Sequence, residues 1–82
     1  MNAANQQFER YSAKVRIQLT LSGHILSIAQ LGPDFIIIRD RKDHPPATGE
    51  IAMWIDDYER RWNVKLPEGI RANQDKTPIS YA

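Results

Sequence analysis

Apolar and polar residues alternate without exception from residue 14 to residue 21. The apolar positions, which share one side of an extended chain, are Val15, Ile17, Leu19 and Leu21. A period of two is typical of a β-strand that buries one face. Ser22-Gly23 follows, and this pair suits the positive φ angles of a two-residue hairpin turn. The pattern predicts a strand that turns directly into a hairpin.

Residues 24–31, which follow this turn, fit two structures. A tight turn would place Leu26 opposite Leu19, which keeps the same face apolar on both strands. We therefore expect a second strand. A short helix at 24–31 is the alternative, with an apolar stripe made of Ile25, Leu26, Ile28 and Ala29.

Four apolar residues in succession, Phe35 to Ile38, come after the turn signal Gly32-Pro33-Asp34. The run is β-branched and too short for an ordinary helix, so it predicts the most buried strand. Its large side chains occupy both faces. The second face therefore needs a cover, which is the other side of a small barrel, a terminal segment or a partner chain.

Two further strands are predicted after an exposed connection over residues 39–49, which is charged and contains Pro45-Pro46. In Glu50–Ile55, Trp54 falls on the opposite face from the apolar row that contains Ile51. Asp56-Asp57 is a plausible tight turn. The last strand runs from Tyr58 to Leu66 and ends at Pro67-Glu68-Gly69.

Together these elements predict an all-β fold, a small five-stranded antiparallel meander that either stays open or curls into a partly open barrel. Residues 14–70 would form this single β domain. Both termini are expected to be poorly ordered. Residues 1–13 are interpreted as a flexible segment or one helical turn, and residues 71–82 as a disordered polar tail.

Composition narrows the classes of function. The 82 residues suffice for one domain with one modest core, and the formal charge of +1 lacks the strong basic excess of a dedicated phosphate-backbone binder. No cysteine is present, which excludes disulfide scaffolds, thiolate zinc sites and thiol catalysis. The polar stretch Met1–Tyr11 has no apolar run of the signal-peptide kind, and no segment is apolar enough to span a membrane. We expect a cytoplasmic protein without membrane contact.

Candidate chemistry is sparse. The two histidines, His24 and His44, lie beside a turn and beside a double proline, and the sequence has neither a glycine-flanked nucleophile turn nor a phosphate loop. We therefore expect no catalytic residues and no cofactor. Asp40, Asp43 and His44 have side chains that suit a divalent cation, but their spacing fits no metal loop, and a solvated loop without a metal is expected.

The strand pattern from Val15 to Leu66, with its glycine-led segment Gly49-Glu50-Ile51, distantly resembles PilZ-type β-barrel domains, which bind cyclic di-GMP. That family uses an Arg-x-x-x-Arg motif, whereas Arg10 and Arg16 are six positions apart here. Its second motif also fails, because Ile25 stands where an acid or amide belongs and Ser27 lies too far from Gly32. The resemblance implies a degenerate barrel that makes protein contacts, and it assigns no ligand-binding residue.

The favoured function is a non-catalytic protein-interaction or accessory module, either homodimeric or bound to another protein. Trp54 and Tyr58 are the candidate apolar anchors, because aromatic residues dominate interface energetics. The alternative for Trp54 is that it covers the second side of the Phe35–Ile38 strand within the same chain. The candidate polar rim consists of Arg39, Arg41, Arg60 and Arg61. The alternative is a nucleic-acid-binding barrel that uses the same basic residues with Trp54 stacked on a base.

Overall fold

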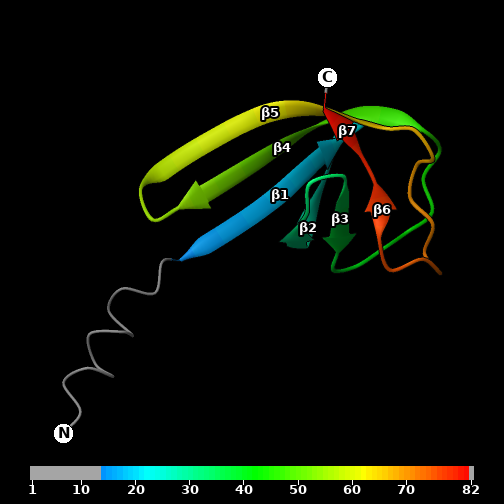
Figure 1. Ribbon diagram of the computed structural model, residues 1–82, viewed down its shortest axis with the longest axis horizontal. Helices are drawn as coiled ribbons and strands as arrows, with labels where there is room; N and C mark the ends of the chain where they lie inside the picture. The colour runs from blue at the N-terminus through cyan, green and yellow to red at the C-terminus, as the bar shows by residue number, and fades with distance from the viewer. Residues whose placement is uncertain (1–13, 82) are drawn as a thin grey trace, which may run out of the picture.

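The computed structural model describes residues 14–81, and all of its regular structure is β. The strands are β1 (Val15–Leu21), β2 (His24–Leu31), β3 (Phe35–Ile38), β4 (Ala47–Ile55), β5 (Tyr58–Leu66), β6 (Thr77–Pro78) and β7 (Ser80–Tyr81) (Figure 1). This part of the chain contains no helix, and therefore none that could cross a membrane. The prediction for residues 1–13 lies outside the described residues.

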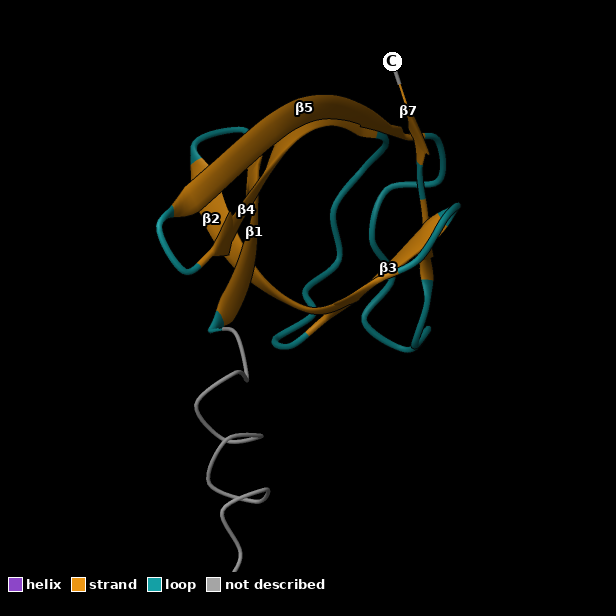
Figure 2. Ribbon diagram, turned by 60° about the vertical axis from the view of Figure 1, so that its left-hand side comes forward, coloured by secondary structure: helices purple, strands orange, loops and turns teal. Residues whose placement is uncertain are grey.

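All neighbouring strands are antiparallel, in the order β6-β3-β2-β1-β4-β5-β7. The two outermost strands, β6 and β7, are separated in sequence only by Ile79, so the two ends of the sheet meet and the sheet is nearly closed into a barrel (Figure 2). The all-β antiparallel fold is confirmed, with seven strands in place of five. β4 pairs with β1 and not with β3, which is the 4-1-2-3 order of a Greek key.

The first hairpin forms as its sequence predicts. Ser22 and Gly23 have φ angles of 52° and 83°, and Leu19 pairs with Leu26 across the ladder. Residues 24–31 are therefore a strand, and the helical alternative is wrong for this segment. Closing the hairpin keeps the apolar face of β1 continuous with that of β2, which a helix would have interrupted.

The core lies inside the barrel and is built by the inward-facing residues of β1 to β5 and by two residues outside them. Its buried members include Leu19, Leu21, Ile28, Ile36, Ile38, Ile51, Val64, Leu66, Ile70 and Ile79. On the second face of β3, the ammonium group of Lys76 lies 4.7 Å from the centre of the Phe35 ring. Part of the cover that this double-sided strand requires thus comes from the C-terminal segment.

β2 bends away from β1 halfway along its length. The register of its pairing with β3 shifts between Ile28 and Gln30, and its pairing with β1 reaches only as far as Gln18 opposite Ser27. Such an irregularity increases curvature and redirects a strand. The start of β1 and the β4–β5 hairpin consequently extend beyond the rest of the barrel as a three-stranded sheet (Figure 1). We call this extension the arm; it comprises residues 15–17, 53–55 and 58–60.

The C-terminal residues 77–81 form a strap across the barrel. β6 pairs with Phe35 and Ile36 at one edge of the sheet, and β7 pairs with Val64 and Lys65 at the other. Ile79, between the two strands, is buried. The prediction of a disordered tail over residues 71–82 is therefore wrong for this segment, because two-residue strands are too short to leave a periodic pattern.

Removing the Ile79 side chain tests the strap. We expect Ile79→Ala to lower the free energy of unfolding by about 2–5 kcal/mol, because it leaves a cavity in the core. Ser80→Ala, at the exposed neighbouring position, should stay within about 0.5 kcal/mol of wild type. Urea denaturation measures both, and equal stabilities of the two variants would show that the strap does not close the barrel.

Candidate protein-interaction surface

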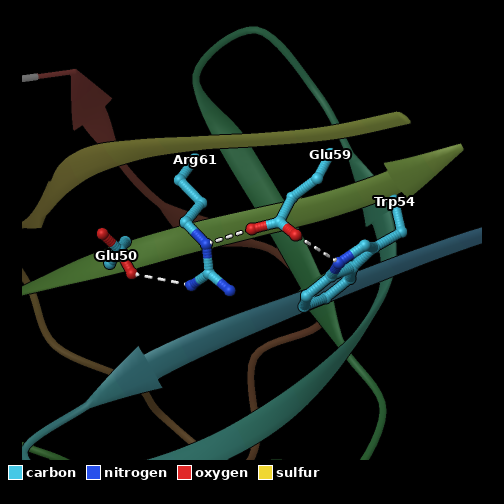
Figure 3. Close-up of polar contacts among 4 residues, drawn as sticks. All are labelled: Glu50, Trp54, Glu59 and Arg61. Atoms are coloured by element: carbon cyan, nitrogen blue, oxygen red, sulfur yellow. Dashed lines mark hydrogen bonds and ion pairs between the residues drawn. The ribbon is translucent and has the colours of Figure 1, made fainter. Parts of the chain in front are cut away.

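The outer face of β4 and β5 carries a network of four side chains (Figure 3). Trp54 Nε1 donates a hydrogen bond to Glu59 Oε1 at 3.0 Å. Arg61 donates to both neighbouring carboxylates, from Nε to Glu59 and from a terminal nitrogen to Glu50 at 3.2 Å. The residues are cross-strand neighbours on one face, so these contacts link β4 and β5.

Trp54 points away from the core, as its sequence position predicts. Its ring is also covered from both neighbouring strands: the guanidinium carbon of Arg16 on β1 lies 4.8 Å from the ring centre, and that of Arg61 on β5 lies 5.6 Å away. Contacts of this kind are favourable because the ring face is electron-rich. Its indole N–H is also bonded to Glu59, so the partly buried Trp54 contacts side chains of both strands that flank β4.

The network shifts two ionisation equilibria. The hydrogen bond from Arg61, followed by that from Trp54, lowers the pKa of Glu59 below its usual value. The bonds to Glu59 and then Glu50 raise the pKa of Arg61. All three charged groups lie at the surface, so the network contributes more to the orientation of the side chains than to stability.

The structure places the six predicted interaction residues, two anchors and four rim arginines, on different parts of the surface. Arg61 joins Trp54 on the outer face, whereas Tyr58 and Arg60 lie on the opposite, inner face of β5. Arg41, in the connection after β3, donates to the carbonyl of Ala72 at 3.2 Å and thereby holds the C-terminal segment. Arg39 is exposed in the same connection, and β2 and β1 lie between β3 and the β4–β5 hairpin. The six candidates therefore do not form one surface.

The inner face of the arm is apolar and incompletely covered by the described residues. Val15 is 55% exposed and Tyr58 is 60% exposed, although both share a face with the fully buried Ile51. The other apolar residues of this face, all partly buried, are Ile17, Met53, Ile55 and Trp62. Their alternation was visible in the sequence, but their exposure follows from the bend in β2, which the sequence pattern did not reveal.

The free edge of β5 adjoins this face. In the β4–β5 ladder, the backbone groups of Tyr58, Arg60 and Trp62 face β4, so those of Glu59, Arg61 and Asn63 face outward. β7 pairs only with Val64 and Lys65. Within residues 14–81, no strand pairs with β5 from Tyr58 to Asn63.

A groove of about 450 Å³ lies beside this edge, next to the end of β7. Its walls are Met53, Arg60, Trp62, Asn63 and Tyr81. The Trp62 and Tyr81 rings are 6.5 Å apart, and the buried Nε1 of Trp62 has no hydrogen-bond partner among the described residues. The groove therefore combines an aromatic wall with an arginine side chain.

Polar side chains of the charged loop after β3 are engaged in hydrogen bonds. Asp43 accepts a hydrogen bond from the backbone N–H of Ala72 at 2.8 Å, and a ring nitrogen of His44 lies 2.7 Å from the carbonyl oxygen of Pro45. Across residues 14–81, no three His, Asp or Glu side chains are grouped as metal ligands. These contacts fix the loop to the C-terminal segment.

Comparison of the chain with family models, with curated proteins and with solved structures finds no match. The resemblance to PilZ-type domains therefore stays a prediction, and the function has to be inferred from the surface itself.

The pKa of Glu59 tests the outer network. We expect it to lie below the usual value in the wild-type protein and to rise in Arg61→Gln, because the principal donor is lost; Trp54→Phe should raise it less. Because the Glu59 pKa is lower in the folded state, the ionised carboxylate stabilises the fold at pH values above the ordinary glutamate pKa of about 4.3. This contribution is lost as the pH falls from there through the lowered pKa. Carboxyl-carbon NMR titration measures the shift. An unchanged Glu59 pKa in Arg61→Gln would contradict the network.

Proposed function

We propose that this protein is a non-catalytic interaction module that takes up an extended segment of a partner protein as an additional strand along β5. The observation that carries the proposal is the open edge from Tyr58 to Asn63, where outward backbone groups adjoin the apolar inner face of the arm. Edge strands with unpaired N–H and C=O groups are templates for strand addition.

Strand addition makes use of both features of the surface. The partner backbone would exchange hydrogen bonds with Glu59, Arg61 and Asn63, and every second partner side chain would lie over the inner face beside Tyr58 and Trp62. Main-chain bonds would supply affinity and the side-chain contacts selectivity. Tyr58 thus keeps its predicted role as an anchor, while Trp54 stiffens the edge from the opposite face.

Protein contacts are favoured over the nucleic-acid alternative. Base stacking needs an open aromatic face, and the Trp54 ring already carries the guanidinium groups of Arg16 and Arg61. The carboxylates of Glu50 and Glu59 also lie beside Arg61 and offset its charge.

Proline at position 63 provides a selective test. Asn63→Pro removes an outward backbone N–H and leaves the β4–β5 ladder intact, since proline is tolerated on an edge facing solvent. Binding peptides are first selected from a displayed library of short random segments. They should bind wild type and Asn63→Ala with similar affinity. Their affinity for Asn63→Pro should be about tenfold or more weaker, because a hydrogen bond is lost and the proline ring obstructs the edge.

Two controls accompany this test. Circular dichroism melting establishes that Asn63→Pro is folded, and NMR of the wild-type complex locates the bound peptide independently of any variant. We expect the amide signals of Glu59, Arg61 and Asn63 to shift. Failure to select any peptide, or peptides that shift other strands and bind Asn63→Pro normally, would refute strand addition at β5.

A further inference from the structure

We infer that the partner segment carries a carboxylate opposite Arg60, with an apolar residue two positions away on either side. This inference rests on the proposed strand addition and specifies the chemistry of the partner. Two observations support it. Arg60 is the one charged side chain on the inner face of the arm, and a second copy of this chain, paired by two-fold symmetry, would not supply a carboxylate beside it.

Arg60 stands alone on an otherwise apolar face. It follows Tyr58 and precedes Trp62 on the same side of β5, and its cross-strand neighbour is Met53. The side chain is exposed, and within residues 14–81 it makes neither an ion pair nor a side-chain hydrogen bond. It also lines the groove beside the open edge. A strand added there would bring one of its own side chains next to this guanidinium group.

The charged side chains on the outer face of β5 along its open edge, Glu59 and Arg61, already have partners of opposite charge within the chain. Arg61 is paired with two carboxylates, and Glu59 accepts from both Arg61 and Trp54. Partner side chains on that side would meet groups that already have partners. Selection by charge is therefore concentrated on the inner face, at Arg60.

The spacing of the partner residues follows from the strand period. The partner residues opposite Tyr58 and Trp62 lie two positions before and two positions after the residue opposite Arg60. Apolar side chains there would cover the exposed Tyr58 ring and the groove wall at Trp62. Because apolar-x-acidic-x-apolar reads the same in both directions, the pattern holds for either strand orientation.

A second copy of the chain fits this edge poorly. Pairing two β5 strands around a two-fold axis places the central residue opposite itself. A pairing that uses most of the open edge Tyr58–Asn63 is centred on Arg60 or on Arg61. In the register centred on Arg60, two guanidinium groups would face each other, and like charges directly opposite each other destabilise a sheet. In the register centred on Arg61, Arg60 would lie opposite Trp62 of the copy and would gain no carboxylate. A foreign strand with a carboxylate at this position has no such conflict.

Three synthetic peptides test the inference: Thr-Val-Thr-Glu-Thr-Val-Thr and its variants with Gln or Lys in place of Glu. Titrations followed by NMR and tryptophan fluorescence, at low salt and up to millimolar peptide, measure their affinities. We expect the Glu peptide to bind about two- to fivefold more tightly than the Gln peptide, and the Lys peptide to bind most weakly, as for cross-strand charge pairs.

Reversing the charge on the protein should reverse this order. Arg60→Glu should prefer the Lys peptide, whereas Arg71→Glu, an equal charge change at an exposed position outside β5, should keep the wild-type order. Light scattering across a range of concentrations should find a monomer.

The outcomes separate the two proposals. Equal binding of all three peptides at the β5 edge would overturn the carboxylate inference and leave strand addition standing. A dimer that dissociates in Asn63→Pro but persists in Asn63→Ala would also overturn it, because the occupant would be a second copy. Absence of binding by every peptide, with unmoved amide signals at the edge, would refute strand addition itself.

Discussion

Each backbone N–H and C=O group in a sheet requires a partner, and a rolled sheet leaves two edges at which those partners are missing. In this protein one short segment, Thr77 to Tyr81, covers both edges at once, because β6 pairs with β3 and β7 pairs with β5. The burial of Ile79 fixes the segment in the core. Among residues 14–81, β7 pairs only with Val64 and Lys65, so no strand of this part of the chain pairs with β5 where it extends into the arm.

The arm has two faces with different properties. On the outer face, Trp54, Glu59 and Arg61 bond to one another and hold adjacent strands in register. On the inner face, apolar side chains that begin the core row continue beyond the point where the barrel can cover them. In the proposed strand addition, side chains that are already held by the outer-face contacts would lose less conformational freedom, which lowers the entropic cost of binding.

The sequence predicted those parts of the fold that depend on local patterns. Strict alternation identified β1, and Ser22-Gly23 fixed its hairpin with β2. The strap was missed because its pairing depends on residues far away in the chain. Trp54 was correctly placed on the face away from Ile51, but its coverage by Arg16 depends on the pairing of β4 with β1, which crosses over β2 and β3. The open edge could not be predicted either, since it depends on where β2 leaves β1 and on which residues of β5 pair with β7.

Hydrogen exchange of individual amides along β5 tests the central claim most directly, because opposite faces of one ladder are compared within one strand. If the edge is open, the outward amides of Glu59, Arg61 and Asn63 will exchange rapidly in the free protein, while those of Arg60 and Trp62, bonded to β4, will be protected. Addition of a bound strand should then slow the three outward amides. Uniform protection of all five amides in the free monomer would show that the edge is already covered, and would contradict the account.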